Sequence, residues 1–362
     1  MRYLKAIITT LIALLLSVWL TSDMNSDYIT TMLLGVRDVE FSDFYDRVIY
    51  NKSEKDISDD IVIVSIDSVN GRNEIAHTLV DLANCQPKVI GVDILFEDFQ
   101  GVEQDSLLID VVSKNKNIIM ACEIDADQSS ITPSIFDGYI SEERLGFVNL
   151  VKRNSLIVRT FMPSMYTNGV KVPSFALSIL SLYDKDAYNK ALQREVEEEK
   201  LLFPPIAFNE IDGRNLLHHK GELKDKVVLV GCMSDKSDYH CTPVNDEMAG
   251  MEVWAIALDN TINHRFLRSF GTLLDWFFAI ISCLFLTFLY LRLNDTNLQN
   301  FGMRLAPMLL ILLLCLFGCY LYYFRIYLNV SKAILLSAIG ILILDILYAL
   351  SDLIKSLLKK YA

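Results

Sequence analysis

Residues 61–67 read Ile-Val-Ile-Val-Ser-Ile-Asp, a run of branched apolar side chains that ends in a carboxylate. A continuous run of this kind indicates a strand that is buried on both faces. Three further runs share this character, at residues 88–96 (KVIGVDILF), 117–123 (NIIMACE) and 226–231 (KVVLVG). Strands buried on both faces are typical of a parallel sheet that is covered by helices.

Stretches with helical periodicity alternate with these strands. They lie at Asn73–Asn84, Asp105–Ser113, Pro173–Leu182 and Met251–Ile262. The alternation predicts an α/β domain with a largely parallel sheet. We expect Leu145–Asn149 and Leu156–Tyr166 to form antiparallel strands. The highly charged stretch Asp184–Lys200 is expected to be a solvated helix or an insertion.

Four apolar segments bracket this domain, at Leu4–Leu20, Leu273–Leu291, Leu305–Tyr323 and Ala333–Leu350. A helix needs roughly 18 or more apolar residues to cross the hydrocarbon core, and the first segment is slightly short of that. Residues 21–272 hold 24 basic and 41 acidic residues, a formal charge of −17, whereas the remaining 110 residues carry +5. The sequence therefore predicts an acidic domain held at a membrane by four transmembrane helices, one N-terminal and three C-terminal.

The distribution of positive charge predicts the orientation in the membrane. Basic residues flank the segments on one side, at Arg2, Lys5, Arg292, Arg304, Lys355, Lys359 and Lys360. The positive-inside rule places them in the cytoplasm, and the large domain outside, although Arg325 and Lys332 then lie on the outer side. The predicted boundaries are 1–22 for the anchor, 23–268 for the external domain, 269–354 for the three-helix region and 355–362 for a cytoplasmic tail.

The first segment has a second interpretation, because a short apolar stretch after a basic start also fits a cleaved signal peptide. It ends Ser17-Val18-Trp19-Leu20-Thr21-Ser22, without a clear small-x-small cleavage site. This favours an uncleaved anchor.

Charge and cysteine usage exclude several classes of partner and cofactor. The acidity of the external block argues against nucleic acid and against docking on anionic lipid. Cys232 and Cys241 are nine residues apart, so they would either form a disulfide or remain thiols. With His240 they lack the spacing of a zinc site, and no phosphate-binding glycine loop or nucleophile elbow is present. We expect no cofactor and no catalytic activity.

A series of short motifs resembles a known family. In order along the chain they are IVSID (63–67), VIGVDILF (89–96), GFVNL (146–150), IVR (157–159), PSFA (173–176), VVLVG (227–231) with Asp238 and Thr242-Pro243, and GMEVWA (250–255). This order resembles the type-two CHASE domain, a sensory extracellular module found with bacterial cyclases and histidine kinases. The resemblance covers roughly residues 39–263. It implies a sensor in the inner membrane of a bacterium, with its main domain outside the cytoplasm.

Acidic residues at the ends of the predicted strands are candidates for binding a ligand. Ligands of parallel α/β sheets bind beyond the carboxyl ends of the strands. Asp67 follows the first strand, Asp93 lies near the end of the second, and Asp238 follows the strand that ends at Gly231. With Arg159, these residues are our candidate site for a cation or for a hydroxylated or amine-bearing ligand. The alternative is structural: Asp67 and Asp93 would cap helices or pair with Arg159 inside the domain.

One charged residue falls within the last apolar segment. Asp345 lies five residues before the inner end of that segment. A carboxylate at the centre of a membrane helix costs about 2.5–3.5 kcal/mol. Asp345 therefore either makes a polar contact with protein or reaches towards the interface.

These features lead to three functional hypotheses. The first is a sensor subunit that binds an external small molecule and signals through its spans, to a separate output protein or within a homo-oligomer. The second is an extracytoplasmic enzyme, which would require a nucleophile or a metal site that the sequence does not show. The third is a structural subunit of an envelope complex. Stabilisation of the protein by a small molecule would separate the first hypothesis from the third.

Overall fold

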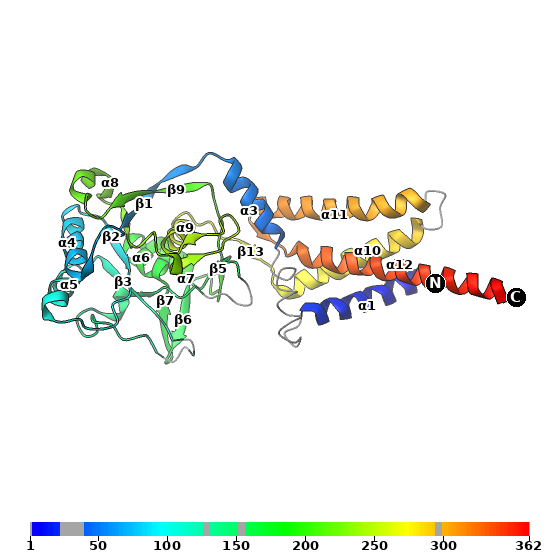
Figure 1. The fold of residues 1–362 in the computed structure, drawn as a ribbon, viewed down its shortest axis with the longest axis horizontal. Helices are drawn as coiled ribbons and strands as arrows, with labels where there is room; N and C mark the ends of the chain where they lie inside the picture. Colours follow the sequence, from blue (N-terminus) through cyan, green and yellow to red (C-terminus); the bar gives the residue numbers. More distant parts are fainter. Residues whose placement is uncertain are drawn as a thin grey trace. The chain divides into compact units, whose positions relative to one another are not determined.

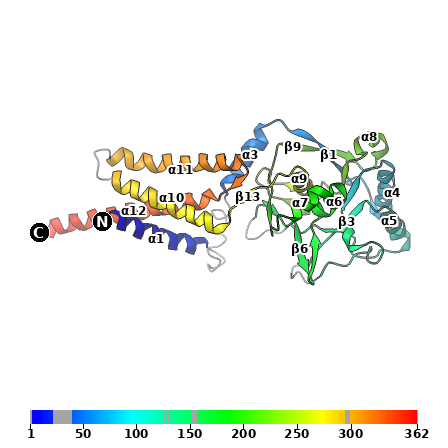
Figure 2. The same ribbon diagram turned by 180° about the vertical axis from the view of Figure 1, so that it is seen from behind.

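The chain divides into two compact units. The computed structural model describes residues 2–21, 40–125, 127, 130–150, 156–293 and 299–361. One unit, Asp46–Phe266, contains the central sheet and is called the sheet unit here. The other, the helical unit, combines Met1–Tyr45 with Leu267–Ala362. Figures 1 and 2 show both units from opposite sides.

The sheet unit is built on six strands in the order β4-β3-β2-β10-β1-β9. In chain order they are β1 (Asp56–Ser65), β2 (Val89–Asp93), β3 (Ile118–Cys122), β4 (Leu145–Phe147), β9 (Ile206–Asp212) and β10 (Val227–Gly231). Each neighbouring pair is parallel. The α/β fold and the parallel sheet expected from the sequence are confirmed.

Successive residues of the central strands enter two separate cores. Ile61 and Ile63 of β1 join the core under α6 (Phe175–Tyr183) and α9 (Gly250–Ile262). Val62 and Val64 join the core under α4 (Gly71–Asn84) and α5 (Val102–Lys114). These two pairs of helices cover opposite faces of the sheet (Figure 1). Burial on both faces explains why the strands read as continuous apolar runs.

Two glycines let α6 lie close against the sheet. A Cβ added to Gly146 in β4 would lie 2.6 Å from the Cα atom of Phe175, and one added to Gly91 in β2 would lie 2.9 Å from the Phe175 ring. Neither space accepts a methyl group. This close approach accounts for the glycines within the sequences VIGVD and LGF.

The structure corrects two expectations about the strands. The segment predicted at Leu145–Asn149 is not antiparallel, because β4 pairs parallel to β3, with Ala121 opposite Gly146. Strand β9 was missed. It lies at the edge of the sheet and only Ile211 within it is fully buried, so it lacks a long apolar run.

Antiparallel pairing occurs outside the central sheet. Strand β5 (Thr160–Phe161) pairs with β8 (Glu199–Lys200), and β6 (Ser164–Thr167) pairs with β7 (Val170–Pro173). The expectation for Leu156–Tyr166 is thus confirmed over residues 160–161 and 164–166. The charged stretch expected to be a helix or an insertion forms α7 (Lys185–Leu192) and then β8. Strands β11 (Tyr239–His240) and β12 (Met248–Ala249) pair in the loop before α9.

Among its described residues, the helical unit holds four apolar helices: α1 (Arg2–Thr21), α10 (Thr272–Leu293), α11 (Gln299–Tyr323) and α12 (Val330–Tyr361). Within the described residues, Thr272–Arg292 and Val330–Leu358 are long and apolar enough to cross a membrane, whereas Tyr3–Val18 and Met308–Tyr323 are shorter apolar stretches. Two of the four predicted spans therefore meet the length and composition test. The short α3 (Phe41–Lys52) begins in this unit and continues into the other.

Small side chains line the contact of α10 with α12. A Cβ added to Gly340 would lie 2.9 Å from the Cys283 Sγ atom, and Cys283 Sγ is 3.4 Å from the Leu336 carbonyl oxygen. Thr10 of α1 contacts the same sulfur at 3.6 Å. Small residues at such contacts are typical of helices packed within a membrane, because they let the backbones approach closely.

Apolar side chains also face away from the helical unit. Leu273, Phe277, Ile281 and Phe285 of α10 are exposed at a spacing of four residues, and α11 and α12 carry similar rows. A water-soluble protein would bury such rows against other elements. The exposed rows instead match helices that are surrounded by lipid.

Two carboxylates have partners within this unit. Asp275, at the start of α10, accepts hydrogen bonds from the Asn329 backbone amide at 3.1 Å and from Lys332 Nζ at 3.3 Å. Lys332 was one of two basic residues that opposed the predicted orientation, and this ion pair offsets its charge. Asp345 of α12 accepts a hydrogen bond from the Tyr290 hydroxyl of α10, so it makes the polar contact with protein that was one of its two interpretations.

Candidate functional site

The sheet register brings the predicted acidic residues to one edge. Ser65 at the end of β1 lies opposite Gly231 at the end of β10, and Gly231 lies opposite Asp93 at the end of β2. Asp67 and the loop that begins at Cys232 follow directly. We call Asp67, Asp93, Cys232, Asp238 and His240 the carboxyl-edge cluster.

Asp67 fixes the start of the loop after β10. Its Oδ1 accepts hydrogen bonds from the Cys232 thiol at 2.8 Å and from the backbone amides of Met233 at 2.9 Å and Ser234 at 3.3 Å. Partial burial raises the pKa of the Asp67 carboxyl, but these hydrogen bonds to the charged form outweigh it, so the pKa is lowered from 3.8. Asp67 is therefore a charged residue that shapes the loop.

Asp93 has the opposite environment. Its side chain is partly buried and accepts no hydrogen bond from the described residues. Burial, and next the negative charge of Asp238, raise the pKa of Asp93 to about 7. Asp93 therefore changes its protonation state near neutral pH and can either accept or donate a hydrogen bond.

Asp238 is held against the start of α9. Its carboxylate packs on Gly250, the first residue of that helix, where the partial positive charge of the helix N-terminus favours an anion. His240 Nε2 lies 3.3 Å from Asp238 Oδ1, and His240 Nδ1 is buried without a hydrogen-bond partner among the described groups. Asp238 is thus the carboxylate whose charge opposes ionisation of Asp93.

The structural alternative had two forms, and the first, in which Asp67 and Asp93 cap helices, is not seen at α4 or α5. The residue before α4 is Asn70 and the residue before α5 is Gly101. Arg159 is buried in the segment next to this loop, since Ile157 forms a parallel bridge with Cys241 and the Val158 amide donates to the Cys241 carbonyl at 2.8 Å. Cys232 and Cys241 are both thiols in this structure, and the disulfide between them stays a hypothesis.

The described residues contain no group of three or more metal-ligating side chains. The side chains of the carboxyl-edge cluster offer hydrogen bonds and negative charge. One protonatable carboxyl (Asp93), one fixed carboxylate (Asp67) and the Asp238–His240 pair would suit a ligand that presents amine or hydroxyl donors.

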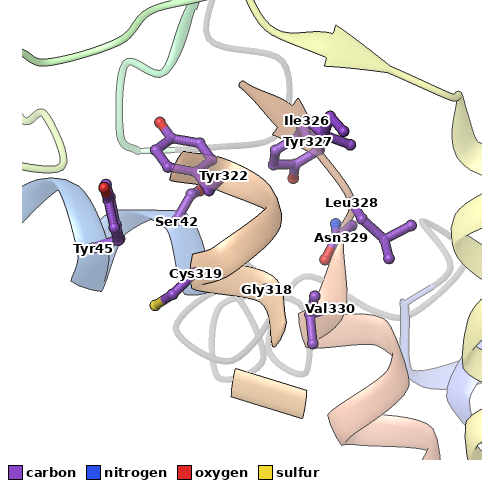
Figure 3. A pocket seen from close by; sticks show the side chains of 10 residues that line it. All are labelled: Ser42, Tyr45, Gly318, Cys319, Tyr322, Ile326, Tyr327, Leu328, Asn329 and Val330. Atoms are coloured by element: carbon purple, nitrogen blue, oxygen red, sulfur yellow. The ribbon is translucent and has the colours of Figure 1, made fainter. Parts of the chain in front are cut away.

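A cavity also lies within the helical unit, between α3, the end of α11 and the turn before α12 (Figure 3). Its volume is about 10 Å³. This is room for about one water molecule, so the cavity is not a site for a larger ligand.

The role of Asp67 leads to a first expected result. Asp67→Asn is expected to lower the free energy of unfolding at pH 7 by about 1 kcal/mol, because the amide is a weaker acceptor for three donors. The lowered pKa means that this stability is present above about pH 4 and is lost as the pH falls through the folded-state pKa. Thermal unfolding of both proteins at pH 7 and pH 3 would measure it. An equal loss at both pH values would contradict a role for the charge.

The fold and the cluster define a class of protein: a parallel α/β domain with acidic side chains at the carboxyl edge of its sheet, joined to helices that carry exposed apolar rows. Comparison with family models matches residues 11–290 to the CHASE2 domain. The match covers more than half of the chain, and the chain belongs to the CHASE2 domain family, whose members are extracellular sensory domains. Searches of curated proteins and of solved structures each found no significant match.

Proposed function

We propose that this protein is a membrane-anchored sensor subunit whose sheet unit lies outside the cytoplasm of a bacterial cell. In this proposal all four helices of the helical unit span the inner membrane, the first as an uncleaved anchor, and both termini are cytoplasmic. The sheet unit binds a small molecule. Binding changes the conformation of the sheet unit, and the helices pass this conformational change to a separate signalling protein or to a second copy of the chain.

Membership of a sensory family carries this proposal. The outward-facing apolar rows on α10, α11 and α12 support a lipid environment for the helical unit. The Asp275–Lys332 pair supports the orientation, since it offsets a basic residue placed on the outer side. Asp93 supports ligand recognition, because it is a carboxyl without a partner among the described residues, beside a second carboxylate.

Cysteine accessibility tests the topology in whole cells. In a background that lacks the seven native cysteines, Asp127→Cys should react with a membrane-impermeant maleimide. Asn297→Cys, between α10 and α11, should react only after the cells are opened. The reverse labelling pattern would overturn the proposed orientation, and labelling of both positions in intact cells would overturn the four-span arrangement.

Ligand recognition is tested on the full-length protein in lipid nanodiscs. Primary amines and small polyols are screened for stabilisation against heat, with Asp93→Asn and Asp238→Asn as test variants and the exposed Asp110→Asn as the control. A ligand of the carboxyl-edge cluster should stabilise the wild type and the control but neither test variant. Equal stabilisation of all four proteins would place its site elsewhere.

The Asp345 contact leads to a second expected result. Asp345→Leu leaves the Tyr290 hydroxyl without its partner and should lower the stability of the helical unit by about 1 kcal/mol, the usual size of a hydrogen bond between membrane helices. Tyr290→Phe should cost a similar amount, and the double variant less than the sum. Unfolding by titration with a denaturing detergent would measure this coupling. Additive costs would show that the two side chains do not depend on each other.

A further inference from the structure

A second cavity lies in the sheet unit at the edge opposite the carboxyl-edge cluster. Its volume is about 1030 Å³. Lys116 precedes β3 and Glu142 to Arg144 precede β4, so these wall residues lie where the strands begin. The β6–β7 hairpin, the end of α6 and α7 form further parts of the wall, together with Ser130, Ile131 and residues 139–141 of the segment between β3 and β4. We call this space the amino-edge cavity.

Three lysines reach this cavity from three different elements. Lys116 lies in the turn after α5, Lys171 on β7 and Lys185 at the start of α7. The ammonium group of none of the three makes an ion pair or a hydrogen bond with the described residues. The three lysines and Arg144 are positive and Glu142 and Glu143 are negative, so the wall carries a formal charge of +2. This is notable because residues 21–272 carry −17.

Arg144 itself is already engaged. Its guanidinium donates to the carbonyl oxygens of Val112 at 2.6 Å, Asn115 at 2.9 Å and Ile118 at 3.0 Å. These bonds satisfy the C-terminal end of α5 and the start of β3. The lysines are therefore the cations that remain available for a ligand.

One wall residue lacks a hydrogen-bond partner. Thr167 of β6 is 5% exposed, and its Oγ1 makes no hydrogen bond with the described groups. A buried hydroxyl without a partner is costly, so such groups are uncommon in native proteins. A polar group of a ligand seated at this wall would supply the missing partner.

The wall also has an apolar and aromatic part. Val170, Val172 and Leu182 line the cavity together with Tyr139 and Tyr188. Sites for small molecules combine apolar surface with a few polar groups in about 300–1,000 Å³. The volume of the amino-edge cavity lies just above that range, which fits a small organic molecule better than a bare ion.

We propose that the amino-edge cavity binds a small organic anion, one that carries a carboxylate or phosphate group on a partly apolar body. Lys116, Lys171 and Lys185 hold the charged group. The tyrosines and Val172 contact the apolar body, and Thr167 bonds to a polar group of the ligand. The site is separate from the carboxyl-edge cluster and does not depend on it.

Calorimetric titration of the full-length protein in lipid nanodiscs tests this site. The probes are phenyl phosphate and 4-hydroxyphenylacetate, with 4-hydroxyphenylacetamide as the neutral counterpart. At least one anion should bind, tenfold or more tightly than the amide, and more weakly as ionic strength rises. Failure of both anions to bind, or equal binding of the amide, would overturn the proposal.

Matched variants locate the binding. Replacing Lys116, Lys171 and Lys185 together by Gln should weaken anion binding by about tenfold or more. Lys114→Gln is the control, because Lys114 is exposed, pairs with Asp110 at 2.7 Å and is not part of the cavity wall. Asp93→Asn should leave anion binding unchanged, which separates this site from the carboxyl-edge cluster. Undiminished binding to the triple variant would sink the proposal.

Thr167→Val adds a readout that does not depend on charge. Valine keeps the shape of threonine but removes the unpartnered hydroxyl, so the protein without ligand should unfold about 2–4 °C higher. The same variant should bind the anion several-fold more weakly, because the proposed hydrogen bond between the hydroxyl and the ligand is lost. A lower unfolding temperature would show that Thr167 already has a partner and would contradict this part of the assignment.

Discussion

Asp93→Asn is expected to stabilise the sheet unit by about 2–4 kcal/mol above pH 7 and to have almost no effect below pH 4. The pKa of Asp93 is raised from 3.8 to about 7 by burial and by the charge of Asp238. Between these values the folded protein binds more protons than the unfolded chain, so stability falls as the pH rises through the window. Asparagine has no charge to bury, so the variant keeps its folding stability as the pH rises.

Denaturant unfolding at several pH values would measure this result. The gain from Asp93→Asn should grow steadily from pH 4 to pH 7, and Asp238→Asn should reproduce part of it by removing the opposing charge. Asp67→Asn is the informative contrast, because its effect should have the opposite sign. A loss of stability in Asp93→Asn at pH 8 would mean that the carboxylate has a structural partner.

Asp105→Ala is expected to destabilise the sheet unit by about 3–5 kcal/mol, the usual cost of removing one member of a buried ion pair. The Asp105 side chain is 0% exposed and lies 2.6 Å from the Arg72 guanidinium, which is 10% exposed. Its other oxygen accepts from the amides of Gln100 at 2.5 Å and Gly101 at 3.1 Å. The substitution leaves Arg72 without a carboxylate partner and two amides without an acceptor.

Asp110→Ala supplies the control on the same helix. Asp110 pairs with Lys114 one turn later, but both side chains are at least half exposed, so its loss should cost about 0.5 kcal/mol or less. Chemical denaturation at pH 7 would compare the two variants. Similar losses of unfolding free energy in both variants would show that burial does not make the Arg72–Asp105 pair more stabilising than the exposed pair.

The central strands could be predicted from sequence because burial on both faces leaves a simple pattern. Strands β1, β2, β3 and β10 each place consecutive apolar residues in the two cores, and all four were expected. Strand β9 has solvent beside it and one fully buried residue, so its sequence Ile-Ala-Phe-Asn-Glu-Ile-Asp gives no such pattern. The direction of β4 depends on which strand lies beside it, which a three-residue strand does not encode.

The candidate site was predictable in position but not in its pairings. Asp67 and Asp93 were expected at one edge because Asp67 follows a strand and Asp93 lies near the end of another, and the register agrees. The sequence did not reveal that Asp67 would hold the Cys232 loop or that Asp238 would be the neighbour that affects Asp93. Those contacts depend on the path of the loop between β10 and α9.

One feature of the sequence could have indicated part of the amino-edge cavity. Asn168 and Gly169 have φ values of 49° and 77°, as expected of the Asn-Gly turns that join two antiparallel strands. The dipeptide therefore indicates the β6–β7 hairpin, which forms one wall. It does not indicate that lysines from α7 and from the turn before β3 face the same space, because those segments are far apart in the chain.

The short pairing of β13 (Arg268–Ser269) with β14 (Ile326–Tyr327) attaches the segment that follows α9 to the helical unit at two points. The chain leaves α9 at Ile262 and reaches α10 at Thr272, and β13 lies on that path. The Arg268 amide donates to the Arg325 carbonyl at 2.8 Å, so the connecting segment is bonded to the turn between α11 and α12. A force along the connecting segment would act on α10 through the covalent chain. It would also act on the turn between α11 and α12 through the β13–β14 hydrogen bonds, so that three helices share it as shear.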